Sequence, residues 1–345
     1  MLGEALVTLR HARGLTQAEL ADLAGVTQAA LSRYESDLRA PEDTVIDALA
    51  ATLGITGDFL RRAGRVRGAM AVDAHMRRRA TAKATVWRRL EAQLNTYRMH
   101  ARQLSEEVTI RATQHVPRFD PIDTPAPDAA RMVRMQWRMP IGPVRALVRW
   151  LEAAGCLVIM QDFGSSRVDG MSQWVDDLPV MLVNERTPTD RLRLTIAHDL
   201  GHLCLHSVDI TDFMEEEATA FAAEFLMPTG AIRAQLRNLT LGRLQDLKRE
   251  WGVSMQALIE KAHTIGYLSP ARRTSFYKAL STIGWRISEP GSDALPPETA
   301  QLPRSIADAV LARGLSLDEL ARIAGYASPT DNTLFQPTQR QLRAV

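Results

Sequence analysis

The sequence predicts a mostly α-helical protein with a small mixed α+β domain near its middle. Three observations predict this class. Apolar residues recur at spacings of three and four along much of the chain, which is the periodicity of amphipathic helices. Two short apolar runs, Cys156–Met160 and Pro179–Asn184, are typical of buried strands. Both runs precede a long helical segment that begins near Asp190 and contains three histidines.

Composition limits the functions to consider. The 345 residues are 46% hydrophobic and 24% charged, as in globular proteins, and the length predicts about two to three domains. A total of 42 Lys and Arg against 40 Asp and Glu excludes a uniformly basic nucleic-acid coat. Two cysteines exclude a disulfide scaffold and a four-cysteine zinc module. Since no apolar run is long enough for a membrane span and no signal peptide is recognisable, we expect a cytoplasmic protein.

Residues 1–63 contain the signals of several short helices. Gly14 ends the first of these helices. Thr16 to Glu19 has the spacing of a capping box, in which side chain and backbone bond reciprocally at the start of a second helix. Gly25 ends that helix, and Thr27 can cap a third. The sequence therefore predicts an all-α N-terminal domain.

Residues 64–128 are predicted to form an arginine-rich helical linker. Apolar residues from Val86 to Val108 follow the 4-and-3 spacing of one amphipathic helix that could pair with another. The run from Arg61 to Arg79 is either a set of extra phosphate contacts or a solvated linker, and both interpretations stay open. Prolines over 117–127 mark the end of the linker.

Residues 129–266 contain the main chemical signal. His198 and His202 are four residues apart, so on a helix their side chains lie on one face and can bind one Zn²⁺. Asp199 stands where the metalloprotease pattern H-E-x-x-H has its glutamate. The alternative is a chance pair of surface histidines. Three of the eight histidines fall at 198, 202 and 206, which favours the metal site.

A catalytic zinc site needs a third protein ligand. His206 lies two turns from His198 on the same straight helix, so the ligand should come from another helix, predicted over 214–226. Only Glu217 of the three consecutive glutamates falls on the apolar face of that helix, and we predict it as the third ligand. Glu215 and Glu216 are interpreted as a solvated charge run. A rim glutamate or a salt bridge is the other hypothesis for Glu217.

These residues resemble the ImmA/IrrE family of zinc metallopeptidases over roughly residues 130–230. The matching features are Asp169-Gly170, the run Pro179–Asn184, Arg191, Arg193, the segment His198–His206 and the segment Glu217–Pro228. The resemblance implies a zincin-like fold in which both histidines and a glutamate before the Ala-x-x-Phe-Ala segment bind zinc. It also implies cleavage of a repressor, often a helix–turn–helix protein, in stress responses or mobile elements.

Asp199 replaces the family's glutamate, which is the general base. One CH₂ fewer retracts the carboxylate by about 1.5 Å, and a misplacement of about 1 Å can lower a rate ~10²-fold. Two functions therefore stay open. The first is a zinc endopeptidase that uses Asp199 as its catalytic base and holds an extended substrate on strand Pro179–Asn184. The second is a non-hydrolytic zinc-binding transcription factor whose peptidase-like domain senses or binds a partner. Thr219 stands where the family often has Asn, a minor departure.

Gly14 to Glu35 resembles the Cro/C1-type (XRE) helix–turn–helix. The resemblance implies that the helix following Thr27 enters the major groove of DNA, where Gln28 can pair with adenine. Gln17 would anchor a phosphate or touch Gln28, and Arg33 would contact the DNA backbone or guanine. The alternative is a helical protein-interaction module. Since such modules usually read paired half-sites, we expect a homodimer on an operator-type site.

Residues 267–345 are predicted to form a helical C-terminal region with a turn-rich insert over 290–303. Within it, Gly314–Gly325 repeats Gly14–Gly25 with seven of twelve positions identical. Pro329 falls where a third helix should run. The repeat is either a recurrent helix–turn arrangement or a degenerate DNA-binding unit, and the sequence leaves both open.

Overall fold

The structure is a computed structural model that describes residues 2–63, 75–78, 84–108, 112–175, 177–206 and 212–338. Most of the arginine run from Arg61 to Arg79 lies outside these residues, so neither interpretation of it is tested. Among the described helices, none has the length and apolar character needed to cross a bilayer.

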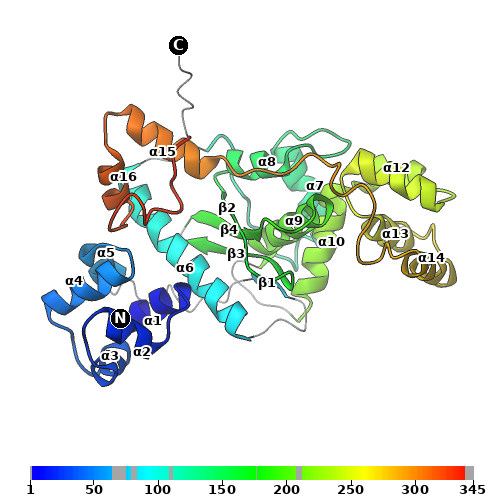
Figure 1. Cartoon of the computed structure of the whole chain (residues 1–345). Helices are drawn as coiled ribbons and strands as arrows, with labels where there is room; N and C mark the ends of the chain where they lie inside the picture. Colours follow the sequence, from blue (N-terminus) through cyan, green and yellow to red (C-terminus); the bar gives the residue numbers. More distant parts are fainter. Residues whose placement is uncertain are drawn as a thin grey trace, which may run out of the picture.

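The N-terminal part of the chain is a bundle of short helices, drawn in blue in Figure 1: α1 (Leu2–Ala12), α2 (Gln17–Leu23), α3 (Gln28–Glu35), α4 (Asp43–Thr52) and α5 (Gly57–Ala63). The predicted capping box is confirmed, since Thr16 Oγ1 accepts from the backbone N of Glu19 and the Glu19 side chain accepts in return. The predicted cap of α3 is also confirmed, because Thr27 Oγ1 accepts from Ala30 N at 3.1 Å. The bundle encloses a core of its own.

A mixed four-stranded sheet forms the centre of the molecule. Its strands are β1 (His75–Arg78), β2 (Leu157–Gln161), β3 (Val168–Val175) and β4 (Leu178–Asn184), in the order β1-β3-β4-β2. β2 runs parallel to β4, and β3 runs antiparallel to both β4 and β1. The two predicted strands are therefore confirmed as β2 and β4. The prediction that Pro179–Asn184 adds an extended substrate is wrong, because β4 has a paired strand on each of its edges.

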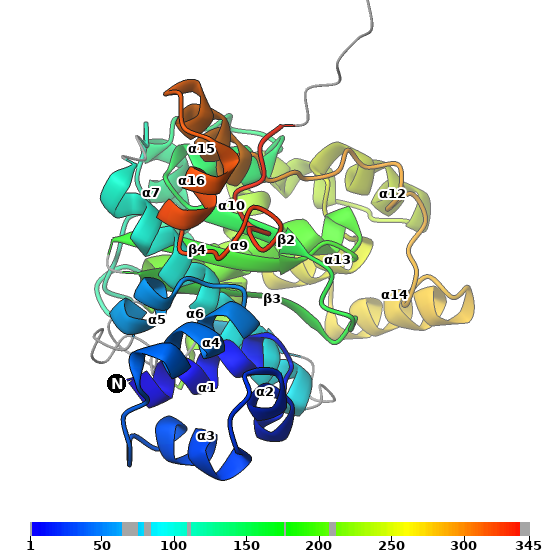
Figure 2. The same cartoon turned by 60° about the vertical axis from the view of Figure 1, so that its left-hand side comes forward.

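Helices cover both faces of the sheet (Figures 1 and 2). The residues Leu157 and Leu182 face a core shared with α6 (Ala84–Glu107), α15 (Leu302–Ala312) and α16 (Leu317–Ile323). Their neighbours Val158 and Met181 face the opposite core. That core is formed with α7 (Ala126–Gln136), α8 (Leu147–Ala153), α9 (Thr189–Leu205) and α10 (Met214–Leu226). The alternation explains why both strands are apolar up to their last residues, Gln161 and Asn184.

A helical extension follows α10. It consists of α11 (Thr229–Ile232), the 3₁₀ helix η1 (Arg233–Leu236), α12 (Leu241–Trp251), α13 (Met255–Thr264) and α14 (Pro270–Thr282). Lys248 Nζ bonds to Asp190 Oδ2 at 2.6 Å and to Glu289 Oε2 at 2.9 Å, all three side chains being buried. Glu298 accepts from the backbone N of Leu147 at 3.0 Å. These bonds hold the predicted turn-rich segment across the start of α8 and α9.

The C-terminal hairpin of α15 and α16 repeats the local geometry of α1 and α2. Ser316 and Glu319 form a second capping box, and Gly314 and Gly325 both have positive φ. Residues 324–338 contain no helix, in agreement with the position of Pro329. The repeat therefore extends to two helices and stops before the third.

This hairpin contacts the N-terminal bundle directly. Thr56 N donates to Gly325 O at 3.0 Å, and Ala327 N donates to Gly54 O at 3.1 Å. The ring of His100, on α6, is stacked between Phe59 at 4.4 Å and Tyr326 at 3.8 Å, measured between ring centroids. Three segments that are far apart in the sequence therefore meet at one buried imidazole.

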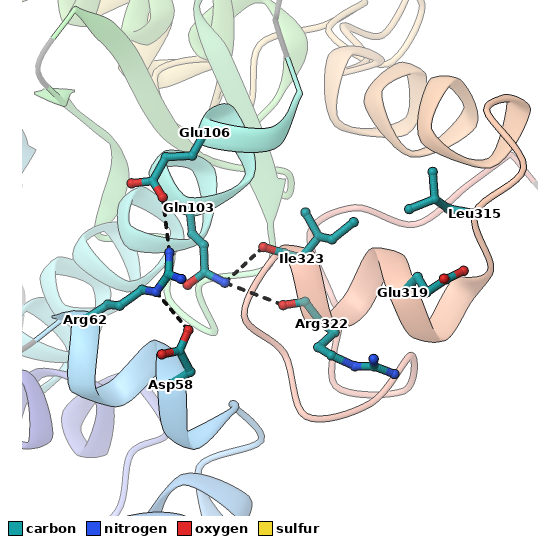
Figure 3. A pocket seen from close by; sticks show the side chains of 8 residues that line it. All are labelled: Asp58, Arg62, Gln103, Glu106, Leu315, Glu319, Arg322 and Ile323. Carbon is teal, nitrogen blue, oxygen red and sulfur yellow. Dashed lines mark hydrogen bonds and ion pairs between the residues drawn. The ribbon is translucent and has the colours of Figure 1, made fainter.

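A cavity of about 330 Å³ lies beside this junction, between α5, α6 and α16 (Figure 3). Arg62 on α5 forms ion pairs with Asp58 at 2.8 Å and with Glu106 at 3.3 Å. Gln103 on α6 donates to Ile323 O at 3.0 Å. α6 thus connects the N-terminal bundle to the C-terminal hairpin through both polar and stacking contacts.

Candidate metal centre and nucleic-acid interface

The two histidines of the predicted metal motif face each other on α9. The helix begins after Pro188 and is buried along most of its length. His198 and His202 are 2% and 0% exposed, and their Nε2 atoms are 3.1 Å apart. Two buried ring nitrogens this close, each on the same helical face, can both direct a lone pair at a single ion.

A carboxylate from α10 completes the cluster, and it belongs to Glu215. Glu215 Oε2 lies 3.4 Å from His198 Nε2, and its Oε1 lies 3.4 Å from His202 Nε2. Within the described residues, these three side chains form the group whose ligand atoms all lie within 4.8 Å of one another. Two imidazoles and one carboxylate are the protein ligands of one class of catalytic Zn²⁺ site.

Glu217, the ligand predicted from the sequence, is not in that group. Its Oε2 lies 2.8 Å from His206 Nε2 instead. The apolar face of α10 predicted Glu217, but both glutamates stand in the first turn of the helix, and its crossing with α9 places Glu215 beside the two histidines. Gly201 permits that crossing, since a Cβ there would lie 3.2 Å from Ala218 Cα. The sequence assigned Glu215 to a solvated charge run, and the structure places its carboxylate beside the two histidines instead.

His202 and Glu215 have the protonation states that a metal site requires. Burial lowers the pKa of His202 to about 4, so its ring is neutral at pH 7. Hydrogen bonds with His198 and His202 hold the pKa of the Glu215 carboxyl well below its usual range. A neutral imidazole and an ionised carboxylate are the forms that bind Zn²⁺.

The second candidate site is the exposed surface of α2 and α3. Gln28 Nε2 donates to Gln17 Oε1 at 3.1 Å, and Gln17 Nε2 donates to Glu35 Oε2 at 2.7 Å. Arg10 holds Glu35 through two bonds of 2.6 and 2.9 Å. Thr27, Gln28 and Arg33 are exposed. A buried ion pair therefore fixes Gln17, and Gln17 in turn orients Gln28 on the exposed surface.

Two family models match the chain. Residues 151–263 match a peptidase model described as the IrrE N-terminal-like domain, and residues 6–60 match a helix–turn–helix model. The chain joins a DNA-binding helix–turn–helix to an ImmA/IrrE-like peptidase domain. A search of curated proteins found no match.

Asp199 of the IrrE-like domain is buried between α9 and β3. The ideal Cβ of a residue at position 170 would lie 2.7 Å from Asp199 Oδ2, so Gly170 is what leaves room for the carboxylate. Ser172 Oγ, two residues along β3, donates to the backbone O of Asp199 at 3.2 Å. β3 therefore holds the helix turn that contains the predicted catalytic base.

Thr219 connects the metal cluster to a large cleft. Its Oγ1 lies 3.4 Å from His198 Nδ1. Thr219 also lines a cleft of about 1300 Å³ beside the IrrE-like helices α9 and α10 and the helices α13 and α14. Apolar or small side chains contribute much of its wall, among them Leu194, Ala220, Ala223, Ala257 and Ile265. The cleft is large enough for a stretch of polypeptide, and Thr219 joins it to the Nδ1 side of His198.

Proposed function

We propose that this DNA-binding regulator is a zinc endopeptidase that acts on a protein partner. The observation that carries the proposal is the convergence of His198, His202 and Glu215 in a domain that matches a peptidase family. In this assignment Glu215 replaces Glu217 as the third ligand. His₂Glu is the ligand set of established zinc peptidases, which supports hydrolysis over a purely structural zinc site.

The residues around the cluster supply binding and proton transfer. A bound Zn²⁺ contributes Lewis-acid activation of water and of a peptide carbonyl. Asp199 is assigned as the general base. It would take a proton from the attacking water and give it to the leaving amine. Gly170 keeps its carboxylate against β3, where a larger residue would displace it.

The cleft beside Thr219 is the proposed position of the substrate polypeptide. One part of its wall is a surface of α10 that presents small side chains at Thr219, Ala220 and Ala223. A repressor, often of helix–turn–helix type in the resembling family, is the proposed substrate. We further propose that two copies of the chain bind paired half-sites on DNA, which would place the peptidase near repressors on the same operator.

Variants of Asp199 that change the length or the charge of its side chain test whether the protein hydrolyses a peptide bond. Zinc-loaded wild type, Asp199→Asn and Asp199→Glu would be incubated with purified helix–turn–helix repressors from the same genome, and products read by mass spectrometry. Hydrolysis predicts a defined cut by wild type, loss of the cut in Asp199→Asn, and a cut retained or faster in Asp199→Glu. Zinc-loaded protein that cuts no repressor in either acidic form would contradict the proposal and favour a non-hydrolytic sensor or partner-binding domain.

A further inference from the structure

Three side chains in a row connect the start of α10 to the metal-facing ring of His202. Glu217 Oε2 lies 2.8 Å from His206 Nε2, and His206 Nδ1 lies 3.0 Å from His202 Nδ1. The side chains of His202 and His206 are fully buried, whereas that of Glu217 is 28% exposed. The row therefore runs from a partly exposed carboxylate to the ring whose other nitrogen, Nε2, faces Glu215.

The protons in this row can be assigned from the number of donors on each group. A neutral imidazole has one N–H and one lone pair, and an ionised carboxylate only accepts. His202 can bind a metal through Nε2 only if its proton is on Nδ1, and that N–H then donates to His206 Nδ1. His206 must then have its own proton on Nε2, from which it donates to Glu217. Each contact is then a hydrogen bond.

We propose that Glu217 and His206 are positioning residues that fix the tautomer and the ring orientation of His202 for metal binding. The proposal rests on the metal site assigned above, and it gives Glu217 a role other than that of a ligand. Hydrogen bonds to the remote nitrogen of a ligating histidine set which nitrogen faces the metal. Here that partner is a second histidine, and a carboxylate orients the second histidine in turn.

Glu217 determines the direction in which the two histidines donate their hydrogen bonds. Without an acceptor at His206 Nε2, a neutral His206 could place its proton on Nδ1 and donate to His202. His202 would then accept at Nδ1 and carry its proton on Nε2, which blocks metal binding at that nitrogen. The Glu217 carboxylate excludes this reversed order because it requires an N–H at His206 Nε2.

The remote nitrogen of the other ring contacts a hydroxyl. The neighbour of His198 Nδ1 is Thr219 Oγ1, at 3.4 Å. A hydroxyl can donate or accept, so Thr219 is compatible with either tautomer of His198.

Nitrogen chemical shifts test the proton order directly. The full chain would be labelled with ¹⁵N-histidine, and long-range ¹H–¹⁵N spectra recorded with and without zinc, with His202→Ala and His206→Ala providing the assignments. With zinc bound, the expected spectrum shows His202 protonated at Nδ1 and His206 at Nε2, and Glu217→Ala is expected to remove the His206 preference. A proton on Nε2 of His202, or a doubly protonated His206, would overturn the proposal.

Zinc affinity separates a positioning residue from a ligand. In a chelator competition, Glu217→Ala is expected to bind zinc about 10- to 100-fold more weakly. Glu217→Gln keeps an acceptor oxygen for His206 and is expected to retain most of the affinity. Glu216→Ala, which removes the adjacent exposed carboxylate, is the matched control and should bind as wild type. Wild-type affinity in Glu217→Ala, or a loss as complete as in Glu215→Ala, would contradict a positioning role.

The two experiments also separate this inference from the metal site itself. If zinc binds stoichiometrically and the tautomers are reversed, the metal site stands and the positioning role is wrong. If wild type binds no zinc but His206 carries its proton on Nε2 next to Glu217, that part of the proton order stands and the metal site is wrong.

Discussion

Asp199 lies so close to Gly170 that a methyl group on that glycine would be 2.7 Å from Asp199 Oδ2 and 2.9 Å from Thr195 Cγ2. Gly170→Ala must therefore displace the proposed base or open the gap between β3 and α9. We expect a loss of about 1–3 kcal/mol in the free energy of unfolding, measured by denaturant titration. Gly242→Ala is the control, since Gly242 is helical and has open space around its Cβ position. Equal stability of the two variants would contradict this packing.

A second glycine controls the contact between the C-terminal hairpin and the helix–turn–helix. A Cβ on Gly325 would collide with the ring of Phe59, at 2.2 Å from Cδ2. Gly314 also has positive φ, and its Cβ position is open. Both alanine variants bear the cost of a strained φ, but only Gly325→Ala adds the collision. Denaturant titration should show Gly325→Ala to be less stable than Gly314→Ala by about 1–3 kcal/mol, and equal losses would count against the contact.

The stacked imidazole of His100 predicts a pH-dependent stability. Burial lowers the pKa of His100 from its ordinary 6.5 to about 3, so the unfolded chain binds a proton that the folded chain does not. The free energy of unfolding is therefore unaffected by this group above pH 6.5. As the pH falls from 6.5 towards 3, it decreases by up to about 1.4 kcal/mol per pH unit.

His100→Phe keeps an aromatic ring in the stack and removes this titration. Its free energy of unfolding should therefore change less than that of wild type between pH 6 and pH 4, although it loses the bond from Nδ1 to Ala324 O. His115→Gln, at an exposed histidine, is the control. If the free energy of unfolding changed with pH equally in wild type and His100→Phe, His100 would have an ordinary pKa in the folded chain and the prediction would be wrong.

The DNA contacts proposed for Gln28 and Arg33 predict two different effects of their substitution on DNA binding. Gln28→Ala should relax base preference by about 1–3 kcal/mol, and Gln17→Ala should do so partly, because Gln17 orients Gln28. If Arg33 contacts a phosphate, Arg33→Ala should weaken binding to all DNA sequences. The slope of log affinity against log salt concentration should then fall by about one in magnitude. Fluorescence anisotropy on a site selected from a random library measures both effects. Arg149→Ala, an exposed residue of α8, should bind as wild type.

Features decided by neighbours in sequence were predictable. The capping box at Thr16, the cap at Thr27 and the helix ending before Pro228 each depend on a few adjacent residues, and each is present in the structure. The same holds for α6, whose apolar spacing alone predicted one long helix, and for the strands β2 and β4.

Features decided by tertiary contacts were not predictable. β3 contains the polar residues Asp169, Ser172 and Gln173, and its pairing with β4 and β1 makes it a strand. The central position of β4 depends on strand order, which its own residues do not encode. The exchange of Glu217 for Glu215 depends on how α10 crosses α9, and the stacking of His100 depends on segments hundreds of residues apart.

Zinc content tests the central claim most directly. The full chain would be purified as wild type, His202→Ala, Glu215→Ala and Glu216→Ala, dialysed against zinc and then against buffer, and analysed by mass spectrometry for metal per chain. The structure predicts stoichiometric zinc in wild type and Glu216→Ala, and little in His202→Ala and Glu215→Ala. The same low zinc content in all four proteins would contradict a metal centre formed by His198, His202 and Glu215.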